Sequence, residues 1–373
     1  MGPPQELSNR VLLSFRHDFH AAVVTVLHPA PDPESPGLPL GGGTKEDALH
    51  PPTDEELNAL VGHVSDGYRI QAERASRVSF GSLRLGCSEK SSLFRMTRVA
   101  SEAAREGYGL HSGVPSRVVL RPSAGAVSLH MAGREVPLRD VRVVATRRAT
   151  TIEAGGRRIS TIEHLLAAFG GLGIHEGVSI EVVGDELPLL DGGARTYCDA
   201  LCELGVRGSA ARLEVVRDGE VRVGESSYFF QRARGSRLEV TIDFNDSRLT
   251  PKAAWEGDPD DFQARIAPAR TFAFADDVRA LARAGAVSHV TPDSVIVLGS
   301  REILCAGEPF AADEPVRHKL LDLAGDLFLY GGPPRGTVIA RRPGHGPTHA
   351  AMREALDREI VRRVPERDAF VFV

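Results

Sequence analysis

The chain has 373 residues, of which 42% are hydrophobic, and a formal net charge of −5. A chain of this size can bury a substantial core and predicts two domains with an appendage, while the negative net charge argues against nucleic-acid binding through bulk positive charge. No run reaches the roughly 18 apolar residues of a membrane span, and no signal-peptide pattern opens the chain, so we expect no stable membrane insertion and a cytoplasmic location.

Residues 1–95 differ in composition from the rest of the chain. Segment 28–56 is rich in proline, glycine and acidic residues, a composition that keeps an unfolded chain solvated. We expect a disordered extension or an over-extended reading frame whose true start is Met96, so that a chain beginning there folds and acts alone. A genuine accessory segment remains the alternative, because residues 21–27 and 56–61 are apolar.

From about residue 101 the predicted elements follow one another closely. In the first group we expect strands at 116–122, 126–132, 141–145 and 177–183, and helices at 160–174 and 195–204. In the second group we expect a hairpin at 212–223 that turns at Asp218-Gly219, strands at 226–233, 237–244, 294–299 and 336–342, and helices near 275–284, at 315–330 and at 347–363.

Strands grouped with helices, without strict β-α-β alternation, predict an α+β fold. We expect two similar domains, 96–208 and 209–373, each a β-sheet packed with a helix layer. A weak sequence similarity within the chain supports this division. Segments 160–173 and 315–332 both place a histidine near a helix start and glycines near its end. Chance similarity between two amphipathic helices is the alternative.

The helix at 315–330 carries a file of ionisable residues beside its apolar face. His318, Asp322 and Asp326 follow at i, i+4 and i+8 and therefore share one stripe. Two ligands one helical turn apart can bind one metal ion. A helix-stabilising His-Asp contact is the alternative for the pair alone.

The helix at 160–174 offers a further ligand in His164 and a carboxylate in Glu163. Ser160 and Glu163 also fit a capping box, in which the carboxylate would bind the N-cap amide. Together with His318 and Asp322, however, these residues supply three nitrogen or oxygen ligands and one spare carboxylate. That set predicts a catalytic zinc site with a general base.

Two further segments carry residues suited to amide chemistry. His345 stands between glycines after a predicted strand, where Asp326 could fix its tautomer and favour its charged form; an exposed turn histidine is the alternative. Thr271 and Phe272 pair a hydroxyl able to donate to an oxyanion with an aromatic ring able to pack on a sugar, although such a pair is common in ordinary strands.

The four cysteines, Cys87, Cys198, Cys202 and Cys305, have no zinc-finger spacing, and we interpret them as reduced thiols. Lysine is rare in the chain, occurring only at 45, 90, 252 and 319. The position of Lys319, directly after His318, therefore favours a role for its ammonium in binding sugar or phosphate oxygens.

Taken together and in order, these segments resemble the UDP-3-O-acyl-N-acetylglucosamine deacetylase family, zinc amidases of lipid A biosynthesis in Gram-negative bacteria. The matching segments are GYGLHSG (107–113), STIEHLLAAFGGLGI (160–174), ELPLLDGGA (186–194), TIDF (241–244), ARTFAF (269–274), VRHKLLDLAGDL (316–327) and PGH (343–345).

The resemblance implies two α+β domains of similar topology with one zinc ion at their interface, a site that Fe²⁺ could also occupy. It implies the ligands His164, His318 and Asp322, the base Glu163, the catalytic His345 oriented by Asp326, the oxyanion-stabilising Thr271, and substrate contacts from Lys319 and Phe272. The implied reaction removes acetate from a UDP-linked, 3-O-acylated N-acetylglucosamine. We expect a monomer.

The sequence departs from the family pattern in three places. The family's Ser-Gly-His is here Pro-Gly-His, segment 288–297 lacks the usual Gly-Gly-Ser, and residues 1–95 have no counterpart. Two alternatives therefore stay open: a metal-dependent deacetylase of another acylated amino sugar, and a non-catalytic relative that binds sugar nucleotides.

Overall fold

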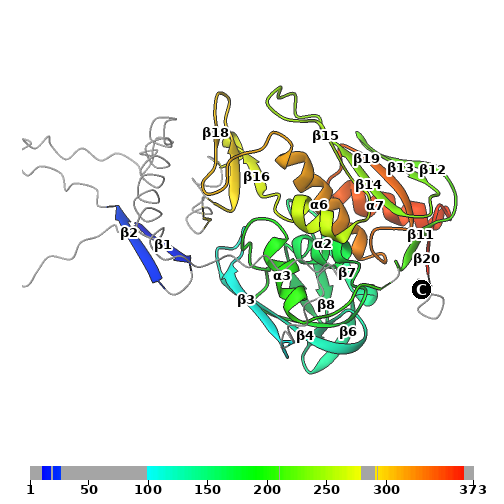
Figure 1. Ribbon diagram of the computed structural model, residues 1–373, viewed down its shortest axis with the longest axis horizontal. Coiled ribbons are helices and arrows are strands. Elements are labelled where there is room, and N and C mark those ends of the chain that lie inside the picture. The colour runs from blue at the N-terminus through cyan, green and yellow to red at the C-terminus, as the bar shows by residue number, and fades with distance from the viewer. Residues whose placement is uncertain are drawn as a thin grey trace, which may run out of the picture.

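A computed structural model describes residues 11–17, 20–26, 99–209, 211–278, 290–291 and 293–364 (Figure 1). Strands β1 (Val11–His17) and β2 (His20–Val26) form an antiparallel hairpin. The remaining residues of the expected N-terminal extension, and most of the helix expected near 275–284, lie outside the described part of the chain. The described residues form a mixed fold of helices and several sheets, which agrees with the expected class at that level.

The first large sheet contains five strands. Its strands are β3 (Ala103–Tyr108), β4 (Pro115–Ala126), β5 (Ser128–Met131), β6 (Arg134–Pro137) and β10 (Glu176–Val183), in the spatial order β3-β4-β10-β5-β6. In β10, Val178, Ile180 and Val182 are buried, because alternate side chains of this strand face the core. Strand β10 is antiparallel to β4 and parallel to β5.

The second large sheet repeats this arrangement. It contains β12 (Gly219–Val223), β13 (Ser226–Gln231), β14 (Ser236–Thr241), β15 (Lys252–Trp255) and β19 (Gly336–Arg341), in the order β12-β13-β19-β14-β15. Strand β19 is antiparallel to β13 and parallel to β14. The last strand of each set thus enters the middle of its sheet, with the same neighbours and directions.

Smaller elements complete the described fold. Two three-stranded sheets consist of β7 (Arg142–Ala145), β8 (Thr151–Ala154) and β9 (Arg157–Ile159), and of β16 (Thr271–Phe274), β17 (Val295–Leu298) and β18 (Ile303–Leu304). Short helical segments are η1 (Leu138–Asp140), α4 (Pro259–Asp261) and the π-helical turn η2 (Phe262–Ile266).

Three local predictions are wrong. The segment at 212–223 is not a hairpin, because β11 (Leu213–Val215) pairs with β20 (Val361–Arg363) while β12 pairs with β13. The last helix, α7 (His345–Asp357), begins at 345 and ends before β20. Cys198 and Cys305 are free thiols as expected, but Cys202 is disulfide-bonded.

Helices α2 (Glu163–Leu172) and α6 (Glu314–Phe328) contact each other at the centre of the molecule (Figure 1). Every residue of α2 is buried, since this helix is covered on all sides. The two backbones approach closely at Gly325, where an added Cβ would lie 2.0 Å from the Glu163 carbonyl oxygen. A third helix, α3 (Arg195–Glu203), packs on α2. No helix within the described ranges has the length and apolarity needed to cross a membrane.

Candidate active site

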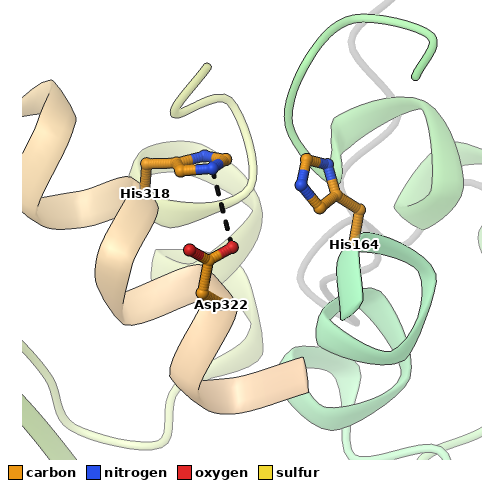
Figure 2. Close-up of side chains that lie close together, drawn as sticks. All are labelled: His164, His318 and Asp322. Carbon is orange, nitrogen blue, oxygen red and sulfur yellow. Dashed lines mark ion pairs between the residues drawn. The ribbon is translucent and has the colours of Figure 1, made fainter. Parts of the chain in front are cut away.

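Two helices bring the predicted metal ligands together. His318 and Asp322 project from α6 and His164 from the first turn of α2, toward one another (Figure 2). One ligand atom from each residue lies within 4.8 Å of the others, and all three residues are buried. His318 Nε2 is 3.5 Å from Asp322 Oδ1. Ligands of a tetrahedral zinc with bonds of about 2.1 Å lie about 3.4 Å apart, so this spacing fits one ion.

Backbone carbonyls set the tautomer of both histidines. His164 Nδ1 lies 3.1 Å from the Gly193 oxygen, and His318 Nδ1 lies 3.0 Å from the Ala269 oxygen. A carbonyl oxygen can only accept, so each Nδ1 carries the proton and each Nε2 presents a lone pair. Metal-binding histidines usually have this second partner.

Burial favours the uncharged, metal-binding form of the imidazoles. Burial, reinforced by the neighbouring His318, lowers the pKa of His164 to about 3. Burial also lowers the pKa of His318, against an opposing effect of Asp322. For Asp322 burial raises the carboxyl pKa, but Lys319 and the nearby histidines outweigh it and hold this pKa well below its usual range. The set therefore combines two neutral imidazoles with one carboxylate.

Lys319 is placed beside the ligand set. Its Nζ lies 2.7 Å from Asp322 Oδ2, and its side chain is 20% exposed. Burial lowers the pKa of the ammonium, but Asp322 outweighs burial and the net shift is upward. The lysine therefore stays charged and binds Oδ2 of Asp322, whereas His318 lies near Oδ1.

Glu163 does not cap its helix. The N-cap of α2 is Ile162, with no side-chain hydrogen bond at that end, so the capping-box alternative with Ser160 is wrong. Instead Glu163 Oε2 accepts from the Thr150 amide at 3.0 Å. Burial raises the pKa of this carboxyl to about 7, which suits a group that exchanges a proton near neutral pH.

His345 begins α7 and is buried, so the alternative of an exposed turn histidine is wrong. Its Nδ1 donates to Asp326 Oδ2 at 2.9 Å, and its Nε2 faces Glu163 Oε1 at 3.7 Å. Burial lowers the pKa of His345, but Asp326 and Glu163 outweigh it and raise the pKa to about 10. The imidazolium and Glu163 thus face each other, one from α7 and one from α2.

Thr271 and Phe272 border this cluster. The Thr271 hydroxyl donates to the Gly192 oxygen at 2.9 Å, and the Phe272 ring meets the His318 ring edge to face at 6.0 Å between centroids. Both residues are half-buried. Gly193 must be glycine here, because an added Cβ would lie 2.3 Å from the Ala267 oxygen. All nine predicted residues thus lie in or beside one site.

Sequence reasoning missed several supporting residues. Thr150 and His349 contact Asp326, and Arg270 forms a buried bidentate ion pair with Glu314, one turn before His318. His349 follows His345 at i+4, a spacing that predicts a shared helix face. Thr150 lies in an unremarkable segment, and no sequence signal identifies it.

Comparisons with known proteins show which family the chain belongs to. Residues 96–357 match the model of the family described as UDP-3-O-acyl N-acetylglycosamine deacetylase. The UDP-3-O-acyl-N-acetylglucosamine deacetylase of Anaeromyxobacter dehalogenans (strain 2CP-C) is 33% identical over 283 residues, which cover 73% of this chain and 92% of that protein. The protein of the same name from Anaeromyxobacter sp. (strain Fw109-5) is 35% identical over 266 residues, covering 69% and 87%. The chain belongs to the UDP-3-O-acyl-N-acetylglucosamine deacetylase family.

Proposed function

We propose that the protein hydrolyses the N-acetyl group of UDP-3-O-acyl-N-acetylglucosamine, giving UDP-3-O-acyl-glucosamine and acetate, in lipid A biosynthesis. The observation that carries this proposal is the buried set of His164, His318 and Asp322 with Glu163 and His345 facing each other beside it, in a member of this family. Such a site combines metal binding with two groups able to move protons.

The proposed metal is one Zn²⁺ per chain, held by His164 Nε2, His318 Nε2 and Asp322. Two imidazoles and one carboxylate are a common catalytic zinc set, and Fe²⁺ also fits these donors. When bound, the metal would polarise the acetamide carbonyl and acidify a water molecule.

Glu163 is the proposed general base. A pKa near 7 makes its carboxylate available at neutral pH while leaving it basic enough to accept a proton from the attacking water. The Thr150 amide holds Oε2, so Oε1 is the oxygen turned toward His345 and free to take that proton.

We propose that His345 acts in its protonated form, as a positive charge near the reacting group and as a proton donor. Its pKa of about 10 keeps it protonated at neutral pH, so it can stabilise negative charge on the tetrahedral carbon's oxygen or protonate the departing nitrogen. Thr271 would add a second donor to that oxygen. Its hydroxyl donates to Gly192 here, so this role requires the hydroxyl to rotate away from that carbonyl.

Surfaces for the rest of the substrate lie at the edge of the site. Phe244, Phe272 and Phe274 are half-buried and pack edge to face around β16, next to His318. They supply apolar surface for the hexose and the acyl chain. The ammonium of Lys319 would contact sugar or phosphate oxygens.

We further propose two domains, residues 96–208 and 209–373, with the metal site between them. The two large sheets with matching strand order, and the origin of the ligands in α2 and α6, support this division. We also propose that the protein acts as a cytoplasmic monomer.

Product analysis tests the function. The protein is incubated separately with UDP-3-O-acyl-N-acetylglucosamine and with free N-acetylglucosamine, and acetate and free amine are measured. We expect both products from the UDP-sugar and neither from the simple sugar. Release from another acylated amino sugar alone would favour the alternative deacetylase. The altered sequence of segment 288–297, whose Ser294 lies beside Gly192, is the reason to consider that alternative. No acetate from any acylated amino sugar would favour a binding protein.

A further inference from the structure

Thr150 contacts the proton-transfer group Glu163 directly and is linked to the other one, His345, through Asp326. It lies between β7 and β8, and its side chain is fully buried. Its amide donates to Glu163 Oε2 at 3.0 Å, and its hydroxyl donates to Asp326 Oδ1 at 2.6 Å. Asp326 in turn accepts from His345 on its other oxygen. One residue therefore links the carboxylate of α2 to the imidazole of α7.

The backbone of Thr150 is tied to the start of α2. Besides the bond to Glu163, the Thr150 carbonyl accepts from the Ile162 amide at 3.4 Å. These two bonds fix the residue relative to the helix end that carries Glu163. Its hydroxyl therefore reaches Asp326 from a defined position, so that a shift of α6 against α2 would stretch the 2.6 Å bond.

His349 completes the contacts of the Thr150 hydroxyl. His349 Nε2 lies 3.1 Å from Thr150 Oγ1 and 3.3 Å from Asp326 Oδ1, and its Nδ1 lies 3.0 Å from the Tyr330 hydroxyl. The Tyr330 hydroxyl also lies 3.3 Å from the His349 carbonyl oxygen, to which it can donate. These groups are all satisfied when Tyr330 donates to Nδ1 or to that carbonyl, Nε2–H donates to Thr150 or Asp326, and Thr150 donates to Asp326. All four residues are buried, which makes an unpaired donor or acceptor costly here.

We propose that Thr150 is a positioning residue, which holds Glu163 directly and His345 through Asp326 in the mutual geometry that proton transfer requires. The proposal rests on the roles of Glu163 and His345 given under the proposed function. The hydrogen-bond partners of the Thr150 hydroxyl are Asp326 and His349, which are neither proposed metal ligands nor proposed substrate contacts. Its loss should therefore act on turnover and leave metal content and substrate affinity nearly unchanged.

Thr150→Val tests this role, because valine keeps the shape and the backbone amide but removes the hydroxyl. With UDP-3-O-acyl-N-acetylglucosamine, we expect kcat to fall by about 10-fold or more, the usual scale for losing a residue that orients a catalytic group. KM and the metal content per chain should stay within about 2-fold of the parent protein. Thr150→Ser keeps the hydroxyl and should restore kcat to within about 3-fold.

Thr151→Val is the matched control. This neighbouring threonine donates its hydroxyl to Ser160 at 3.2 Å and touches neither Glu163 nor Asp326. Its kcat should match that of the parent. If Thr150→Val does not fold, Thr150→Ala is measured in its place with the same expected loss.

A spectroscopic signal separates positioning from general damage. In protein labelled with ¹⁵N-histidine, the Nδ1–H signal of His345 reports its hydrogen bond to Asp326. Removing the Thr150 hydroxyl leaves Asp326 with one donor fewer, so this signal should move in Thr150→Val and keep its position in Thr150→Ser and Thr151→Val.

Two outcomes would overturn the proposal. One is a Thr150→Val protein with parental kcat and an unmoved His345 signal; the other is a Thr150→Ser protein as impaired as Thr150→Val. Glu163→Gln is measured in the same assay. Normal turnover by that variant would overturn the proposed role of Glu163, whereas an inactive Glu163→Gln beside a fully active Thr150→Val would overturn the role of Thr150 alone.

Discussion

The two large sheets share one strand order, yet the helices attached to them carry different chemistry. In each set the strands are followed by a small three-stranded sheet, a buried central helix, a fifth strand and a last helix. The central helix α2 contributes one proposed ligand, His164, and α6 contributes two, His318 and Asp322. Each central helix thus brings a histidine from near its start to the same place, His164 from the first turn of α2 and His318 from the second turn of α6.

The last helices differ more. The segment before α3 enters the site only through its backbone, because the Gly193 carbonyl orients His164. In the second set, by contrast, the first residue of α7 is His345, whose side chain enters the site itself. A repeated scaffold therefore supplies equivalent helix starts, while residues at those starts decide whether each one binds metal, moves protons or only supports a neighbour.

The strongest test of this comparison removes the ligands from one side only. We expect a His318→Ala, Asp322→Ala double variant to lose its metal, from about one ion per chain to near zero, and its activity with it, because one imidazole cannot hold the ion alone. Metal analysis by mass spectrometry measures this. Full metal retention would refute the assignment of α6 as the principal ligand helix.

Variants of the two proton-transfer groups, Glu163 on α2 and His345 on α7, should lose turnover but keep the metal, unlike variants of the ligands. Glu163→Ala and His345→Ala are each expected to lower kcat by roughly 100-fold or more, the usual scale of lost acid-base catalysis, while metal content stays near one per chain. Steady-state kinetics and metal analysis of the same samples check this. Loss of metal in either variant would move that residue into the ligand set.

Asp326→Asn sharpens the assignment of His345. The carboxylate stabilises the imidazolium, so a neutral amide should lower the pKa of His345 from about 10, and the protonated form should be lost at lower pH. The alkaline limb of the kcat profile should therefore move toward neutral pH. An unmoved limb in the variant would show that a different group titrates there.

The smallest expected effect concerns the contact between α2 and α6. Gly325→Ala places a Cβ 2.0 Å from the Glu163 carbonyl, so the free energy of unfolding should fall by about 1–3 kcal/mol through overpacking. Gly235→Ala is the control, since no heavy atom lies within 4 Å of its added Cβ; its stability should change by no more than about 0.5 kcal/mol. Urea unfolding measures the free energy of unfolding of both variants. Equal stability of the two variants would contradict the close approach of α2 and α6 at Gly325.

Local periodicity predicted the elements that carry the site. The stripe of His318, Asp322 and Asp326 follows from helical spacing alone, and Gly173 caps the end of α2. The contacts between elements were harder to predict from the sequence. The hairpin at 212–223 had a suitable Asp-Gly turn, but Val215 pairs with Val361, far along the chain, and no local signal reports such a partner.

The same limit explains why Thr150 was missed. Its partner Asp326 is 176 positions away, so its role exists only after the elements have packed together. Glu163 shows the opposite limit: its spacing from Ser160 left a local cap open as an alternative, whereas in the structure the carboxylate contacts Thr150 and faces His345. Family resemblance, more than spacing, identified Thr271, Phe272 and Lys319 as candidates, and their roles remain proposals.

Anomalous diffraction at the zinc edge tests the central claim most directly, with crystals of the protein purified without added metal. We predict one strong peak between α2 and α6, about 2.0–2.2 Å from His164 Nε2, His318 Nε2 and an oxygen of Asp322. A peak bound by the α6 residues without His164, or a metal ion bound elsewhere with this cluster empty, would contradict a site shared between the two helices.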